Sequence, residues 1–122
     1  MKNSINETEC TDAEKLTLQL DLKYNISFLY WWKQDGIWKL VIVFDNYNSL
    51  DRNEIKDDIS KAISNIGIAS FDTSDCAPSG TNIIDQSLRM VASIPSKQFL
   101  RVEMTNSSIS QLHIEHTIIL RG

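Results

Sequence analysis

The sequence predicts an α+β domain with a mostly antiparallel sheet of about six to seven strands and one well-defined helix, in the order β-β-β-α-β-β-β-β. Three observations support this fold class. Several segments alternate apolar and polar residues, an Asp-Gly pair separates two strongly apolar runs, and a single stripe with helical spacing lies in the middle of the chain. A chain of 122 residues is long enough for one domain with its own core.

The N-terminal region predicts a loose lead-in followed by a strand. Residues 1–14 are polar and carry a net charge of −3, so we expect the single domain to span residues 15–122. From residue 15 onward, apolar residues alternate with polar ones, which predicts a strand with one buried and one exposed face. The apolar positions are Leu16, Leu18, Leu20, Leu22 and Tyr24.

Residues 28–33 and 37–44 are two apolar runs that predict a central hairpin. Asp35-Gly36 between them is the preferred pair for a two-residue hairpin turn. This turn pairs Lys33 with Trp38, Trp31 with Leu40 and Leu29 with Ile42. Both faces of the hairpin are then apolar. A helix layer can cover one face, and the other requires later strands, a second subunit in a homodimer, or a partner.

Residues 51–67 have the pattern of an amphipathic helix. Asp51 is a suitable N-cap, Glu54 completes a capping-box pattern, and Gly67 is a typical helix terminator. Asp57 and Asp58 lie off the apolar stripe and should be exposed to water. The stripe consists of Ile55, Ile59, Ala62, Ile63 and Ile66.

The C-terminal half predicts four short strands. Residues 68–73 form the first, and residues 74–82 form a loop because they contain Pro78 and Gly80. Alternation favours a strand over residues 84–94, although Ile84, Leu88 and Val91 also fit a helix. Residues 99–105 and 111–120 are the last two strands, and Asn106-Ser107-Ser108 is the predicted turn between them.

No residue pattern in the chain predicts catalysis, a cofactor or a metal site. Cys10 and Cys76 stand outside any C-x-x-C motif, so neither a disulfide framework nor a zinc site is expected. His113 and His116 lie three residues apart in a predicted strand and should point to opposite faces. Nucleophile, phosphate-loop and dinucleotide motifs are missing. We therefore expect a protein that is not an enzyme.

Charge is concentrated in the middle of the chain. Residues 45–85 have a net charge of −5, and the whole chain has −4, which argues against direct binding of nucleic acid. The block is either a solvated surface or a face that meets a basic protein partner. The predicted partner-binding residues are Glu54, Asp57, Asp58, Asp72, Asp75 and Asp85. The aromatic hairpin is the competing candidate. The polar N-terminus and the lack of a long apolar run predict a cytoplasmic protein without membrane contact.

In its size, acidity, Asn/Ile/Ser-rich composition and lack of catalytic motifs, the chain resembles bacterial immunity proteins of contact-dependent inhibition and related polymorphic toxin systems. The resemblance extends over the whole chain but includes no shared motif, so it assigns no residue a role. It implies tight binding of a cognate toxin domain, often a basic nuclease, with the acidic block imitating nucleic acid. Two alternatives are a phage-type inhibitor of a host nucleic-acid-binding protein and a small-molecule binding domain lined by the aromatic hairpin.

Overall fold

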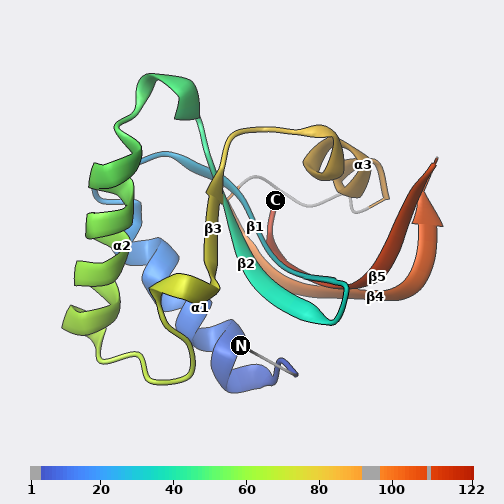
Figure 1. Ribbon diagram of the computed structural model, residues 1–122, viewed down its shortest axis with the longest axis horizontal. Coiled ribbons are helices and arrows are strands. Elements are labelled where there is room, and N and C mark those ends of the chain that lie inside the picture. The colour runs from blue at the N-terminus through green and yellow to red at the C-terminus, as the bar shows by residue number, and fades with distance from the viewer. Residues whose placement is uncertain (1–3, 92–96, 110) are drawn as a thin grey trace.

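The computed structural model describes residues 4–91, 97–109 and 111–122 and shows a sheet with helices on both faces (Figure 1). The five-stranded sheet has the order β3-β2-β1-β5-β4. β3 runs parallel to β2, and the other neighbouring pairs are antiparallel. The strands are β1 (Ile26–Gln34), β2 (Ile37–Phe44), β3 (Cys76–Ser79), β4 (Phe99–Ile109) and β5 (Leu112–Arg121).

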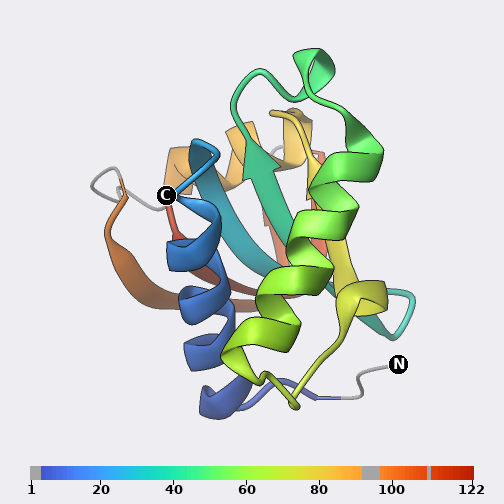
Figure 2. The ribbon, with the colours of Figure 1, turned by 90° about the vertical axis from the view of Figure 1, so that its left-hand side faces the viewer.

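Three α-helices accompany the sheet within the described residues: α1 (Glu7–Leu20), α2 (Arg52–Ile66) and α3 (Ile83–Val91). Figure 2 shows α1 and α2 side by side in front of the sheet, with α3 behind it. Two short 3₁₀ helices, η1 (Tyr47–Ser49) and η2 (Thr73–Asp75), lie in connections. The α+β class is confirmed. The predicted single helix with six to seven antiparallel strands is wrong.

The predicted first strand is the second half of helix α1. The Asn6 side chain accepts a hydrogen bond from the Glu9 N–H at 3.2 Å and begins the helix inside the expected lead-in. Leu16 and Leu20 are buried one helical turn apart, whereas Leu18 is exposed, so the alternation of leucines did not mark a sheet face. The buried residues of α1 follow helical spacing: Glu9, Cys10, Ala13, Leu16, Thr17 and Leu20.

The central hairpin and its register are confirmed. Trp31 pairs with Leu40 and Leu29 with Ile42, and the turn residues Asp35 and Gly36 have φ angles of 53° and 77°. The face with Trp31 packs in a first core under α1 and α2. The opposite face, with Phe28, Tyr30 and Trp32, forms a second core with α3. Helix α3 is thus part of the cover that this second apolar face required.

Helix α2 is confirmed at both ends. The Asp51 carboxylate accepts hydrogen bonds from the N–H groups of Asn53 and Glu54, and Gly67 ends the helix with a φ of 81°. Ile55, Ile59, Ala62 and Ile63 of the predicted stripe are buried. The Glu54 carboxylate binds Lys23 in place of the expected capping contact.

The chain after α2 departs from the prediction. The expected strand over 68–73 is irregular, with Phe71 buried against the first core. The expected loop over 74–82 contains strand β3, whose Pro78 is tolerated because β3 is an edge strand. The expected strand over 84–94 is wrong up to residue 91, where α3 ends, and residues 92–94 lie outside the described part of the chain.

Strands β4 and β5 form the predicted last hairpin, but the expected turn at Asn106-Ser107-Ser108 is wrong. β4 continues to Ile109, and Asn106 has a φ of 44° within the strand. Before Asn106, Met104 contacts the second core, and beyond it Ile109 does so although it lies five residues further on. In a regular strand, residues an odd number apart point to opposite faces, so the strand changes its facing between Met104 and Ile109, where Asn106 has its left-handed backbone.

Candidate functional site

The six acidic residues predicted to bind a partner lie in three different places. Glu54, Asp57 and Asp58 are on α2, Asp72 and Asp75 are at η2, and Asp85 is in α3 on the other face of the sheet. Asp75 and Asp85 are buried. The structure therefore does not bring the six carboxylates together in one surface.

The pair at η2 forms a capping box. Asp72 accepts a hydrogen bond from the Ser74 N–H at 2.9 Å, and Asp75 accepts one from the Asp72 N–H at 3.0 Å. These bonds hold the short helix that leads into β3. Hydrogen bonding by Ser74 lowers the pKa of the Asp72 carboxyl. Asp72 is exposed, while Asp75 is part of the interior.

Asp85 holds α3 against the sheet. Its Oδ1 accepts a hydrogen bond from the Tyr30 hydroxyl at 2.7 Å, and its Oδ2 accepts one from the Asn82 N–H at 3.0 Å. Asn82 in turn caps α3 by accepting from the N–H groups of Ile84 and Asp85. Burial raises the pKa of both the Asp85 carboxyl and the Tyr30 hydroxyl. Asp85 is thus a structural residue.

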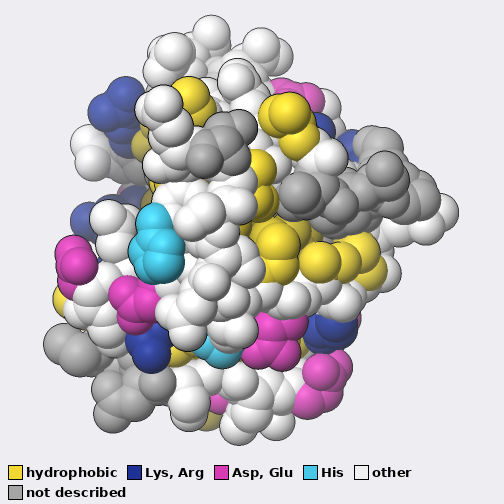
Figure 3. Space-filling model, turned by 90° about the vertical axis from the view of Figure 1, so that its right-hand side faces the viewer, with side chains coloured by type: hydrophobic (Ala, Val, Ile, Leu, Met, Phe, Trp, Pro, Cys, Tyr) yellow, Lys and Arg dark blue, Asp and Glu magenta, His cyan; other side chains and the backbone are white. Residues whose placement is uncertain are grey.

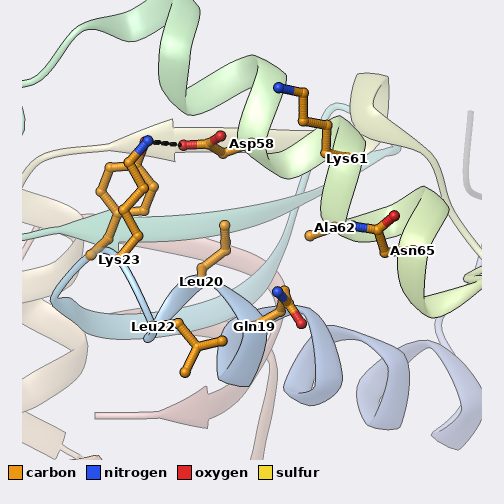
Figure 4. A pocket seen from close by; sticks show the side chains of 9 residues that line it. Gln19, Leu20, Leu22, Lys23, Asp58, Lys61, Ala62 and Asn65 are labelled. Atoms are coloured by element: carbon orange, nitrogen blue, oxygen red, sulfur yellow. Dashed lines mark hydrogen bonds and ion pairs between the residues drawn. The ribbon is translucent and has the colours of Figure 1, made fainter.

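Glu54 and Asp58 share one cation with the chain after α1. The Lys23 ammonium group binds Asp58 (Figure 4) and also Glu54. The Tyr24 hydroxyl donates to Asp58 at 2.5 Å. Hydrogen bonds from Lys23 and Tyr24 lower the pKa of Asp58, and burial together with Asp58 raises the pKa of Tyr24 to about 12. Asp57, which is exposed, has no hydrogen bond or ion pair within the described part of the chain.

A cavity of about 230 Å³ lies beside this cluster, between the end of α1 and α2 (Figure 4). Leu22 stands at its rim with 82% of its surface exposed, and Leu18, one turn earlier, is 56% exposed. The cavity combines apolar side chains with charged and polar ones, and protein interfaces contain the same mixture. The lining residues are Gln19, Leu20, Leu22, Lys23, Tyr24, Asp58, Lys61, Ala62 and Asn65. We call this surface, with Leu18 and Glu54, the α1–α2 face.

Sequence reasoning missed the two exposed leucines because it placed them on the buried face of a strand. A signal for the helix was present. Asn6 followed by Glu9 matches a capping pattern, and Cys10, Ala13 and Leu16 repeat every third residue. Reading that spacing would have put Leu18 and Leu22 on the outer side of a helix.

The remaining candidates for chemistry are clusters of metal-ligating side chains and the two histidines. No group of three or more His, Cys, Asp or Glu side chains in residues 4–91, 97–109 and 111–122 is arranged to hold a metal ion. His116 is half-buried, with Nε2 at 2.5 Å from Glu103 and its ring against Trp38. His113 is exposed. Among the described helices, none combines the length and apolar character needed to cross a membrane.

Comparisons with models of protein families, with curated proteins and with solved structures found no match.

Proposed function

We propose that this protein is a non-enzymatic inhibitor of the immunity type, which binds a cognate toxin domain in the cytoplasm through the α1–α2 face. The observation that supports the proposal is the exposure of Leu22 at the cavity that Asp58 of α2 also lines, with Leu18 exposed one turn earlier on α1. Of the acidic residues considered from the sequence, Asp58 lines the cavity, Glu54 shares Lys23 with Asp58, and Asp57 is an exposed residue of the same helix.

The leucines supply affinity in this proposal. Leu22 projects from the turn that follows α1 and leaves most of its side chain in water. Full burial of one leucine side chain by a partner is worth about 1.5–3 kcal/mol. Exposed leucines can therefore supply much of the binding energy of an interface, which usually depends on a few apolar anchors.

The charged rim supplies orientation and speed. Lys23 already pairs with Glu54 and Asp58, so these carboxylates offer a partner less free charge than the sequence indicated. Asp57 is exposed, and the chain has a net charge of −4. Both would attract a basic, nuclease-type domain. We therefore expect rim charges to affect the association rate and the leucines to affect dissociation.

Site-specific photo-crosslinking in the source cell tests the proposal. A photoreactive amino acid at Leu22 should capture one protein, and the same group at Asn48, an exposed position in η1, should not. The captured protein, expressed alone, should arrest growth, and co-expression of the wild-type chain should restore it. Leu22→Lys should abolish the rescue, and Asn48→Lys should preserve it.

The outcomes test the binding surface and the immunity function separately. Rescue that persists in Leu22→Lys would show that the α1–α2 face is not the binding surface. A captured protein without toxicity would reject the immunity function, and a host nucleic-acid-binding protein in its place would favour the phage-type inhibitor. Both substitutions are at exposed positions, so a folded far-UV circular dichroism spectrum is expected for both variants.

A further inference from the structure

A second hollow lies on the opposite side of the sheet from α1 and α2. Figure 3 shows hydrophobic side chains gathered there, on the side where α3 faces the end of the β4–β5 hairpin. The hollow has a volume of about 450 Å³. Its described lining consists of Ile83, Ser87, Ile109, Gln111 and Leu112, and we call it the α3 groove.

The β4–β5 hairpin and the first turn of α3 form the α3 groove. Beyond the left-handed Asn106, Ile109 of β4 and the facing Leu112 of β5 pack against the second core, on the α3 side of the hairpin. The bond from Tyr30 to Asp85 holds the first turn of α3 over the second core. Ile83 then stands at the outer rim with 75% of its surface exposed. The apolar walls come from two elements, α3 and the end of the β4–β5 hairpin.

Ser87 is the polar group of the α3 groove. It is only 8% exposed, and its hydroxyl has no hydrogen-bond partner within residues 4–91, 97–109 and 111–122. A side-chain hydroxyl group in largely apolar surroundings gains stability from a hydrogen-bond partner. A group that enters the groove and hydrogen-bonds to Ser87 would supply this partner.

We propose that the α3 groove binds a small amphipathic molecule with an apolar, ring-sized body and one hydrogen-bonding group. The body packs against Ile83, Ile109 and Leu112, and the polar group meets the Ser87 hydroxyl. The volume falls within the roughly 300–1,000 Å³ of ligand pockets, which combine apolar walls with few polar groups. Ser87 lines a concave hollow and not a flat surface, so the occupant is a small molecule that can enter the hollow. This site is independent of the α1–α2 face.

Binding of indole and 1-methylindole tests the proposal. The two probes have nearly the same apolar ring system, but only indole has an N–H that can donate to Ser87 Oγ. Titration followed by ¹H–¹⁵N NMR should shift the amide signals of residues 83, 87, 109 and 112. Indole should bind about fivefold more tightly than 1-methylindole, as expected for one additional hydrogen bond.

Three variants test whether the two probes bind in the α3 groove. Ser87→Ala should weaken the binding of indole about fivefold and leave the binding of 1-methylindole unchanged, because the groove keeps its shape. Ile83→Lys should weaken both probes, and its exposed position leaves the fold intact, which the same spectra verify. Leu22→Lys, on the α1–α2 face, should weaken neither.

The proposal is overturned by any of three results. One is the absence of shifts at the four groove amides up to the solubility limit of indole. Another is equal binding by wild type and Ile83→Lys, which would mean general adhesion to apolar surface. The third is an equal loss of affinity for both probes in Ser87→Ala, which would show that the hydrogen bond to Ser87 does not contribute to recognition.

Discussion

The Tyr30 hydroxyl in β1 donates a 2.7 Å hydrogen bond to the Asp85 carboxylate in α3, and both side chains are buried. The same carboxylate accepts from the Asn82 N–H and thereby completes the cap of α3. One acidic residue therefore both begins the helix and fastens it to the centre of the sheet. The α3 groove depends on this contact, because Ile83 and Ser87 belong to the same helix.

Removing the Tyr30 hydroxyl should destabilise the protein. Tyr30→Phe leaves one oxygen of a buried carboxyl group without its donor, which costs about 1–3 kcal/mol in the free energy of unfolding. Urea denaturation should show a lower midpoint with an unchanged m-value. Tyr47→Phe is the control, since the Tyr47 hydroxyl has no hydrogen bond in the described structure, and it should change stability by less than about 0.5 kcal/mol. Equal losses in both variants would contradict the role of the bond.

The Asp85 carboxyl should titrate above its ordinary range. Burial raises its pKa, while the hydrogen bonds from Tyr30 and Asn82 oppose that rise. A raised folded-state pKa means that Asp85 favours folding below its unfolded pKa of about 3.9, and that this contribution is lost as pH rises through the folded pKa. Tyr30→Phe should move the titration to still higher pH. Carboxyl ¹³C NMR of wild type and variant measures both midpoints, and a lower midpoint in the variant would refute the assignment.

Substitutions in α1 distinguish a helix from the predicted strand. Leu16→Ala creates a cavity in the first core and should cost about 2–5 kcal/mol, because Leu16 is fully buried. Leu18→Ala should cost less than about 0.5 kcal/mol, because Leu18 projects into water. Both leucines would share one face in a strand, and similar losses would then be expected. Chemical denaturation of the two variants decides between these arrangements.

The contact between Asp58 and Lys23 should give a stability that depends on pH. Because Lys23 and Tyr24 lower the Asp58 pKa, the stabilisation is present above the unfolded pKa of about 3.9 and is lost as pH falls through the folded value. Asp58→Asn should therefore be less stable than wild type at pH 7, by at most about 1 kcal/mol, and the difference should vanish in acid. Asp57→Asn removes a neighbouring exposed charge and should show no such pH dependence.

The sequence by itself determined the features whose physical cause lies within a few residues. The turn at Asp35-Gly36 needs two positive φ angles, and its position sets the hairpin register down to the pairing of Leu29 with Ile42. The ends of α2 depend on Asp51 and Gly67, which act on backbone groups of the adjacent turn. These local signals predicted the hairpin, its two apolar faces and one helix correctly.

Only the tertiary structure decided which apolar residues are buried when two periods fit. Leu16, Leu18, Leu20 and Leu22 satisfy a strand pattern, but packing of α1 against α2 and the sheet buries only two of them. The four-residue β3 becomes a strand because β2 offers it a free edge. Contacts between segments far apart in the chain settle both cases, and no local pattern records them.

The candidate site was likewise predictable only in part from the sequence. The acidic residues were visible in the sequence, but their surroundings were not: Lys23 is 31 residues from Glu54, and Tyr30 is 55 residues from Asp85. Folding turned Asp75 and Asp85 inward as hydrogen-bond acceptors and left Leu18 and Leu22 outside. Charge is a property of the residue, whereas exposure is a property of the packed chain, and partner binding requires both.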